Sequence, residues 1–380
     1  MDQPQIEASR PIGKGAHGSV YQICDQTGKM WALKEIKLPN PSILLETAIL
    51  TNFNCPYLMH ADHLFYQPAT GQPTSIQILF ELATNDLCQW TAKHAATDDQ
   101  IWDWARCLLL ALNELHQAKV IHGDVKAKNI LLYPDDRIRL TDFTLSCLNM
   151  PQVNRATKRT CTVTHRAPEI WLNQSWDEKI DIWAFACTLY EMAVGSLLFP
   201  VQDTRQSESY LYCLVHFCSH HLGQPIEPVN NQSNTDVKYQ PTQLATRFQC
   251  RTGQDHIRDL FWASLIVDPQ QRPSAAQLLE RFFDQPSELP KHGKSIVTDN
   301  GMLTENEMKL VYGQNEPAWV QVLLVRFLAL IKKHEIKVSI SSIDTARSII
   351  HKICLISTGL VPWEQEVSLI RNMQHKHYFW

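Results

Sequence analysis

The hydrophobic pattern of the chain changes near Asp98, from the alternation typical of strands to the spacing typical of helices. Before that point, residues 10–24 and 28–38 alternate apolar and polar side chains around a glycine-containing turn, and residues 75–83 are apolar enough for a buried strand. After it, residues 97–117 have helical spacing and open with an Asp pair, which suits the positive end of a helix. The sequence therefore predicts an α+β fold with a small antiparallel-sheet lobe followed by a larger helical lobe.

The rest of the chain adds helices and one boundary. A helix is expected at 41–50, where Pro41 and Ser42 stand at its start. Later stretches with helical spacing are 181–194, 207–222, 274–283, 317–334, 344–357 and 363–373. A Pro-rich polar stretch at 284–295 marks a boundary. We expect one domain at 1–283 (small lobe about 1–82, large lobe about 83–283), a linker at 284–316 and a helical C-terminal extension at 317–380.

Composition restricts the partners and the compartment. The 380 residues are 44% hydrophobic and 19% charged with a net charge of −4, so we expect no nucleic acid and no anionic membrane as a bulk partner. The 11 cysteines have no repeating spacing, which indicates buried or free thiols inside the cell, in the cytoplasm, the nucleus or both. The N-terminus has no apolar segment of a signal peptide. Residues 318–331 are too short to span a membrane comfortably and contain Arg326, so we expect a buried helix there.

One cluster of cysteines and histidines has residue types that can bind zinc. It consists of Cys213, His216, Cys218, His220 and His221. Zinc sites usually have tight pairs of ligands separated by a loop, whereas these residues fall within one predicted helix. We therefore expect helix packing there and no metal.

A glycine pattern lies in the first hairpin. Gly13, Gly15 and Gly18 follow G-x-G-x-x-G-x-V with Val20, and glycine lets a backbone come close to phosphates. The same spacing marks dinucleotide-binding turns that lead into a helix, but here a strand follows and carries Lys34. The pattern favours a hairpin over a nucleotide, with Lys34 reaching its phosphates. An ordinary glycine-rich hairpin is the alternative.

Four polar residues further along suit phosphoryl transfer. Asp124, Lys126 and Asn129 lie on one short loop, and Asp142 follows 13 residues after Asn129. The stretch between them, 130–140, is expected to form a tight hairpin that presents Asn129 and Asp142 to the same metal. Transfer of a phosphoryl group needs oxygen ligands for Mg²⁺, a cation on the phosphates and a carboxylate that orients the attacking hydroxyl.

With these parts in this order, the chain resembles eukaryotic-type protein kinases from about residue 12 to 283, which implies the bilobal protein kinase fold. The resemblance implies that Lys34 pairs with Glu46, that Asp124 is the catalytic base and that Lys126 steadies the transferred phosphate. The residues that it implies for Mg²⁺ are Asn129 and Asp142.

The resemblance also implies an ATP site and three structural contacts. The residues implied around ATP are Gly13, Gly15 and Gly18 at the phosphates, Ile12, Val20, Ala32 and Leu131 around the adenine, Phe80 behind it, the backbone from Glu81 to Ala83 at its edge, and Asp86 at the ribose. Glu169 is expected to form a buried ion pair with Arg272, and Asp181 to support the catalytic loop. Thr162 matches the threonine typical of Ser/Thr-specific kinases.

Several motifs are similar to those of cyclin-dependent and mitogen-activated kinases: "HRAPE", "GSLLFP", "HHLGQP" and "FELATNDL". The start of the 41–50 helix is similar to a cyclin-binding helix but is one residue short. This leaves open an activator at 41–50 or at the C-terminal extension. Protein substrates are the partners that the resemblance implies.

Two residues depart from the family's pattern. Gly123 stands where the family has an Arg that binds a phosphate on the activation loop, so phosphate on Thr157 loses a partner and activity is expected without it. Thr144 replaces the Gly of D-F-G, which leaves two effects open, a hindered flip of Asp142 or a tilt of Asp142 away from the metal.

The sequence thus predicts a protein kinase that uses ATP and Mg²⁺ to phosphorylate Ser/Thr hydroxyls. One alternative is a pseudokinase scaffold that binds nucleotide or partners without transfer. Another is a binding module in the C-terminal extension, with the kinase domain as an accessory.

Overall fold

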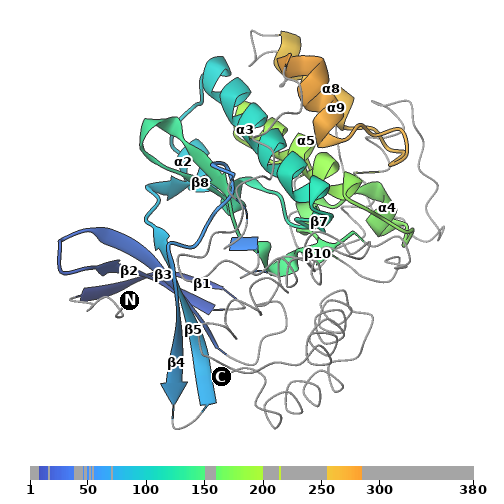
Figure 1. Cartoon of the computed structure of the whole chain (residues 1–380). Helices are drawn as coiled ribbons and strands as arrows, with labels where there is room; N and C mark the ends of the chain where they lie inside the picture. The colour runs from blue at the N-terminus through green and yellow to red at the C-terminus, as the bar shows by residue number, and fades with distance from the viewer. Residues whose placement is uncertain are drawn as a thin grey trace, which may run out of the picture.

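The computed structural model describes residues 8–15, 18–37, 46, 49–50, 53, 55–69, 72–149, 160–199, 214 and 255–284. Their sheet and their helices form two separate lobes (Figure 1). The small lobe holds the described residues up to 81, and the large lobe holds those from 82. The α+β architecture expected from the change of hydrophobic period is confirmed.

The small lobe is a five-stranded antiparallel sheet with the order β1-β2-β3-β5-β4. Its strands are β1 Ala8–Gly15, β2 Gly18–Cys24, β3 Met30–Lys37, β4 His63–Ala69 and β5 Gln72–Glu81. Its two faces bury different side chains. Ala32 and Ile36 join the main core, while Leu33, between them on β3, packs with Ile23 and Leu79 in a separate small cluster.

The strand β4 was not expected from the sequence. This strand lies at the edge of the sheet and contains Pro68, with an irregular register between Gln67 and Pro68. Proline has no N–H to donate and is tolerated in sheets mainly at edges and bulges. Because Pro68 interrupts the alternation of side chains, the sequence does not predict a strand here.

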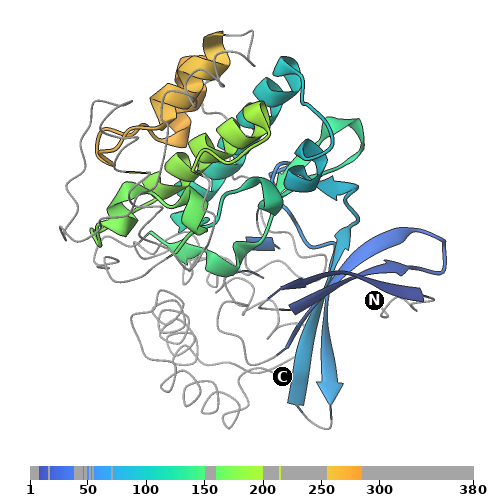
Figure 2. The same cartoon turned by 180° about the vertical axis from the view of Figure 1, so that it is seen from behind.

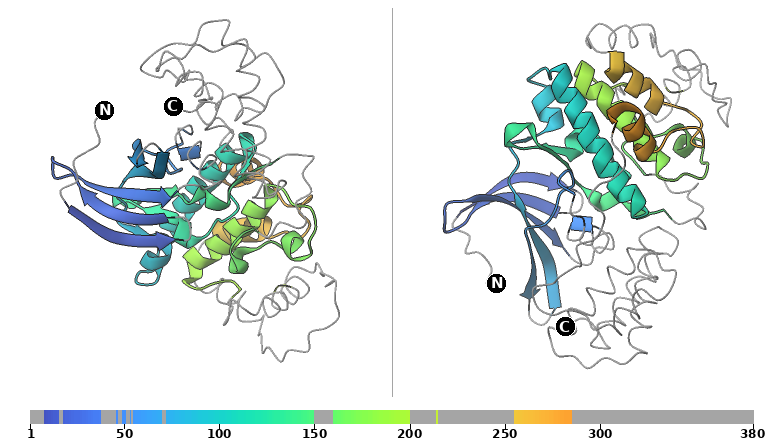
Figure 3. Two further views of the ribbon diagram at one scale, coloured as in Figure 1. Left: turned by 90° about the horizontal axis from the view of Figure 1, so that it is seen from below. Right: turned by 45° about the horizontal axis from the view of Figure 1, so that its top comes forward.

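The large lobe is built on two long helices, α3 and α5, which Figures 2 and 3 show side by side, with α8 and α9 packed beyond them. Its α-helices are α2 Leu87–Thr91, α3 Asp98–Gln117, α4 Pro168–Trp171, α5 Lys179–Val194, α8 Asp255–Ser264 and α9 Ala275–Phe283. Reciprocal hydrogen bonds between Thr97 and Gln100 start α3, and those between Ser274 and Gln277 start α9. Helix α5 is buried from Ile180 onward, so it forms the centre of the lobe.

Short strands and 3₁₀ turns connect these helices. The strands are β6 Asn85–Asp86, β7 Val120–Ile121, β8 Ile130–Leu132, β9 Ile138–Leu140 and β10 Cys147–Leu148. The 3₁₀ turns are η1 Ala127–Asn129, η2 Pro134–Asp136, η3 Phe143–Leu145 and η4 Val163–His165. Strands β8 and β9 pair with Ile130 opposite Leu140, which confirms the tight hairpin expected between Asn129 and Asp142.

A buried ion pair connects α4 to the loop before α9. The guanidinium of Arg272 donates to both oxygens of Glu169, at 2.7 and 3.0 Å, and both side chains are almost fully buried. Arg272 also donates to backbone carbonyls of Ile266, Val267 and Lys179. The pair expected from the sequence is confirmed, and its extra bonds offset the cost of burying the charges.

Several expectations fall outside the described residues. They are the zinc-like cluster, Thr157, the linker, the C-terminal extension, and the 207–222 helix apart from Leu214. Of the 41–50 helix, the structure describes Glu46, Ile49 and Leu50. In the part that is described, no helix is long and apolar enough to cross a membrane, and no cysteine forms a disulfide.

Candidate active site

The loop after β7 is held from below by Asp181 of α5. One oxygen of the Asp181 carboxylate, Oδ2, accepts the backbone N–H of His122 at 2.8 Å, and Oδ1 accepts that of Gly123 at 2.8 Å. His116, at the end of α3, places its Nε2 2.9 Å from Oδ2. The Asp181 side chain is completely buried. The expected support of the catalytic loop by Asp181 is therefore confirmed.

The ring of His122 ties the loop to the end of β9. Its Nδ1 accepts the backbone N–H of Asp124 at 3.2 Å, which leaves the proton on Nε2, and Nε2 lies 3.1 Å from the carbonyl oxygen of Thr141. Burial lowers the pKa of His122 below its usual value, which favours the same neutral form. The ring also packs edge-on against Phe143, at 5.3 Å between centroids.

The structure shows why a glycine stands at position 123, which the sequence alone did not reveal. Its φ is +78°, in the region that favours glycine, and a Cβ atom added there would lie 2.8 Å from the carbonyl oxygen of Leu145 and 3.2 Å from Oγ1 of Thr160. The sequence showed only that an Arg is missing. In the structure, any side chain at this position strains the loop or displaces its neighbours.

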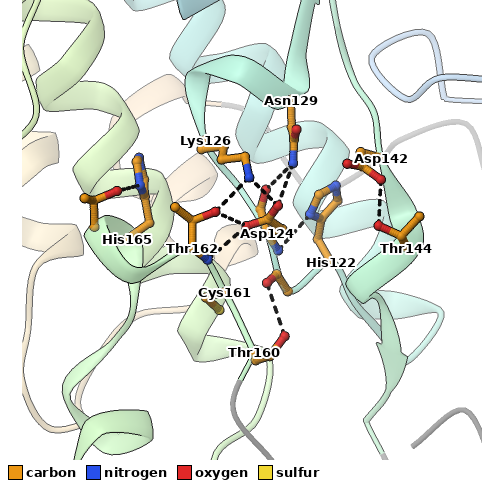
Figure 4. Close-up of polar contacts among 12 residues, drawn as sticks. His122, Asp124, Lys126, Asn129, Asp142, Thr144, Thr160, Cys161, Thr162 and His165 are labelled. Carbon is orange, nitrogen blue, oxygen red and sulfur yellow. Dashed lines mark hydrogen bonds and ion pairs between the residues drawn. The ribbon is translucent and has the colours of Figure 1, made fainter. Parts of the chain in front are cut away.

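The carboxylate of Asp124 is fixed by four hydrogen bonds (Figure 4). Its Oδ1 accepts the backbone N–H of Thr162 at 3.0 Å and the Thr162 hydroxyl at 2.7 Å. Its Oδ2 accepts Nζ of Lys126 at 2.6 Å and the amide of Asn129 at 3.0 Å. Burial acts to raise the pKa of Asp124, but the bonds from Lys126 and Thr162 and the Lys126 charge bring it below its usual value. Asp124 is therefore ionised at neutral pH.

Lys126 and Thr162 are also bonded to each other. Nζ of Lys126 donates to the Thr162 hydroxyl at 2.7 Å, so Asp124, Lys126 and Thr162 form a closed triangle. Thr162 lies just before η4. The triangle therefore links the loop after β7 to the segment that leads into η4, the end of the activation segment.

The β8–β9 hairpin brings Asn129 to Thr141, the residue before Asp142. The backbone N–H of Thr141 donates to the carbonyl oxygen of Asn129 at 2.9 Å. The side-chain NH₂ of Asn129 donates to Asp124, at 2.8 Å to its carbonyl oxygen and 3.0 Å to Oδ2. This orientation turns the amide oxygen of Asn129, the atom that a cation binds, away from Asp124.

Asn129 and Asp142 fit a magnesium ion by their chemistry, since both offer hard oxygen donors. No group of three or more His, Cys, Asp or Glu side chains that could hold a metal is found among the described residues. A cation at these two residues would complete its shell with phosphate oxygens and water, as Mg²⁺ does at nucleotides.

Lys34 is paired with the acidic residue expected from the sequence. Its Nζ lies 2.5 Å from Oε1 of Glu46, whose side chain is 2% exposed. Lys34 shares a face of β3 with Ala32 and Ile36, which join the main core. The sheet therefore directs Lys34 toward the large lobe.

The residues expected around the adenine come from both lobes. Ala32 on β3 lies opposite Phe80 on β5, and both are buried. Val20 on β2 and Leu131 on β8 are half-buried and pack against the same core. Ile12 on β1 is 47% exposed, so its side chain is accessible to a ligand.

The three glycines differ in what they do. Gly15 lies opposite Gly18 at the end of the β1–β2 hairpin. A Cβ on Gly18 would lie 2.3 Å from the carbonyl oxygen of Glu35, so this glycine is needed for packing on β3. A Cβ on Gly13 would make only ordinary contact with Val20. Approach of phosphates remains the prediction for Gly13 and Gly15, while Gly18 has a second reason within the sheet.

Ion pairs of Glu81 stabilise the segment between the lobes, Glu81 to Ala83. The backbone N–H of Glu81 donates to Oδ2 of Asp62 at 3.0 Å. The Glu81 carboxylate forms ion pairs with Arg139 at 3.0 Å and Arg137 at 3.3 Å. Ala83 follows, half-buried, where the segment enters the large lobe.

Asp86, expected at the ribose, is the N-cap of α2. Its carboxylate accepts the backbone N–H of Gln89 at 2.8 Å and the side-chain amide of Gln89 at 2.6 Å. The cap fixes the direction of the Asp86 carboxylate. A ribose hydroxyl would donate to the same carboxylate.

Comparisons with known proteins decide the family. Residues 6–283 match the family model described as protein kinase domain. The chain belongs to the protein kinase family. The bilobal protein kinase fold expected from the sequence is thereby confirmed.

Similar proteins narrow the group within the kinases. Mitogen-activated protein kinase HOG1 of Scheffersomyces stipitis is 30% identical over 294 residues, which are 73% of this chain and 73% of that protein. Cyclin-dependent kinase C-2 C of Arabidopsis thaliana is 29% identical over 304 residues, 74% of this chain and 46% of that protein. Mitogen-activated protein kinase HOG1 of Saccharomyces cerevisiae is 29% identical over 293 residues, 73% of this chain and 64% of that protein. The expected enzyme class, a Ser/Thr protein kinase near these two groups, is confirmed.

Two contacts of the site were not expected from the sequence of the kinase. His116 touches Asp181, but a single His at the end of a helix carries no pattern that could reveal this. The hydroxyl of Thr144 donates to Oδ1 of Asp142 at 2.7 Å, whereas the sequence raised only the backbone stiffness of Thr144. The spacing of two residues across a 3₁₀ turn could have suggested the second contact.

The geometry at Gly123 predicts a stability difference between two glycine variants. Gly28 also has a positive φ, +81°, but a Cβ there would meet nothing within 4 Å. Gly28→Ala is expected to lower the free energy of unfolding by about 1–2 kcal/mol from backbone strain alone. Gly123→Ala is expected to lower it by roughly 1–3 kcal/mol more, because its Cβ is also crowded. Urea unfolding of both variants measures the difference, and equal losses would contradict the crowding.

Proposed function

We propose that this kinase is active, and that it transfers the γ-phosphoryl group of ATP, with Mg²⁺, to Ser/Thr hydroxyls of proteins. The observation that carries the proposal is the fixed carboxylate of Asp124, which holds four hydrogen bonds from Thr162, Lys126 and Asn129. Positioning and electrostatic stabilisation supply most of the catalysis in phosphoryl transfer, and the proposal assigns both to the described residues.

Asp124 acts on the substrate hydroxyl. Its pKa is below the usual value, so the carboxylate is ionised, and the substrate hydroxyl is proposed to replace one of the four donors that it has without substrate. A weak base of this kind orients the hydroxyl first and receives its proton as the bond to phosphorus forms. The Thr162 hydroxyl, at 2.7 Å from Oδ1, fixes the direction in which Asp124 meets the substrate.

Two cations act on the phosphates. Lys34, held by Glu46, contacts the phosphates of ATP, and Lys126 neutralises charge on the group in transfer. Asn129 and Asp142 are the proposed ligands of Mg²⁺, which when bound neutralises charge on the phosphate oxygens. The adenine is proposed to lie among Ile12 and the side chains described above, with Glu81 to Ala83 at its edge.

Phosphate on the activation loop is proposed to be unnecessary. The end of the segment is already attached to the catalytic loop by protein groups. Arg166 donates to the carbonyl oxygens of Thr160 and Cys161, both at 3.0 Å, and Thr162 is bonded to Asp124. Gly123 has no side chain with which to bind a phosphate.

The proposed partners are protein substrates, with an activator at 41–50 or at the C-terminal extension left open. An intracellular location, in the cytoplasm, the nucleus or both, is also proposed. The scattered cysteines and the mitogen-activated and cyclin-dependent kinases among the similar proteins support it.

The first test measures transfer of labelled phosphate from ATP to a mixture of Ser-, Thr- and Tyr-containing peptides. Lys34→Met and Asp124→Asn are each expected to lower turnover at least a hundredfold, because each removes a group that positions a reactant. The matched controls are Lys29→Met and Asp135→Asn, which change exposed residues outside the site. Wild-type turnover in both site variants would contradict the assignment, and absence of transfer by the natural protein would favour the pseudokinase.

The second test concerns control by phosphate. Treatment with phosphatase and the Thr157→Ala variant are both expected to change turnover by less than tenfold, about 1.4 kcal/mol in the barrier. Mass spectrometry of the treated protein verifies that Thr157 carries no phosphate. A loss of tenfold or more on phosphatase treatment would refute independence from the loop. Gly123→Arg is unsuitable as a probe because its Cβ is crowded.

A further inference from the structure

Thr144 touches the proposed magnesium ligand directly. Its Oγ1 lies 2.7 Å from Oδ1 of Asp142 (Figure 4). The hydroxyl donates this hydrogen bond and the carboxylate oxygen accepts it. One of the two oxygens of Asp142 is therefore held by the protein itself.

The backbone conformation of Asp142 bears on the role of its contact with Thr144. Asp142 has φ +65° and ψ +76°, a left-handed conformation that is uncommon for residues other than glycine. Such conformations persist only where the surrounding contacts hold them. The Thr144 hydroxyl gives the carboxylate on this backbone a second point of attachment.

The turn that carries Thr144 is itself attached to the catalytic loop on both sides. Phe143 is buried and packs its ring against His122. The hydroxyl of Ser146 donates to the carbonyl oxygen of His122 at 3.0 Å, and its N–H donates to the carbonyl oxygen of Phe143 at 3.1 Å. Thr144 lies between these two attachments. Its β-branched side chain also has few rotamers, so its hydroxyl is presented in a fixed direction.

We propose that Thr144 is a positioning residue of the metal site, a role that rests on the proposed function. Its hydroxyl holds Oδ1 of Asp142, so that Oδ2 is the oxygen directed to Mg²⁺. Groups that orient a metal ligand in this way commonly change metal affinity by about 10–100-fold when they are removed. The residue that replaces the family's glycine thus takes part in the site.

Three variants separate the hydroxyl from the other properties of Thr144. Thr144→Val keeps the branched shape and removes the hydroxyl, Thr144→Ser keeps the hydroxyl and removes the branch, and Thr144→Gly removes both. Thr91→Val is the matched control, since its hydroxyl donates at 2.9 Å to the carbonyl oxygen of Leu87, within α2. Melting temperatures verify that each variant is folded.

The readout is binding of Mn²⁺, as a paramagnetic substitute for Mg²⁺, to the full chain in the presence of a non-hydrolysable ATP analogue. Electron paramagnetic resonance gives the dissociation constant without any transfer step. Thr144→Val and Thr144→Gly are expected to raise it about tenfold, whereas Thr144→Ser and Thr91→Val are expected to stay within about twofold of the natural protein.

Each other outcome counts against a defined part of the account. An unchanged or lower dissociation constant in Thr144→Val would overturn the positioning role, and a lower one would mean that the hydroxyl competes with the metal for Asp142. Failure of Thr144→Ser to keep the natural value would overturn it as well. No Mn²⁺ binding by the natural protein would overturn the proposed metal site and the role of Thr144 together. Loss of transfer with normal Mn²⁺ binding would count against the proposed function alone.

Discussion

The carboxylate of Asp181 is the interaction on which the rest of the site depends. It accepts the backbone N–H groups of His122 and Gly123 and lies within hydrogen-bond distance of His116. A buried charge is costly unless it is bonded in this way, so the loop and the charge stabilise each other. Because α5 is buried from Ile180 onward, it holds Asp181 rigidly, and the direction of the loop sets where Asp124 stands.

Gly123 and Thr144, the two residues that depart from the kinase pattern, belong to one local arrangement in the structure. The missing side chain at Gly123 lets the carbonyl oxygen of Leu145 come close, which brings the turn at Phe143–Leu145 against the catalytic loop. That turn carries Thr144, whose hydroxyl reaches Asp142. A small residue in one segment and a polar residue in the other therefore contribute to the same local arrangement.

Much of this site could be predicted from residue types at fixed spacing. The hairpin between Asn129 and Asp142 follows from the spacing of residues along the chain, and the Lys34–Glu46 pair follows from the resemblance to protein kinases. The strand β4 could not be predicted, because a proline at a sheet edge breaks the alternation that marks a strand. The crowding at Gly123 was equally hidden, since it depends on a contact with residues more than twenty positions away.

Amide hydrogen exchange in the segment 120–126, compared between the natural kinase and Asp181→Asn, tests most directly whether Asp181 organises the catalytic loop. Asn keeps the shape of Asp but replaces one accepting oxygen by an NH₂ group, which faces a backbone donor. The account predicts that His122 and Gly123 exchange at least tenfold faster in the variant, about 1.4 kcal/mol of lost protection, while α3 exchanges as before. Equal exchange at both amides in the two proteins would contradict it.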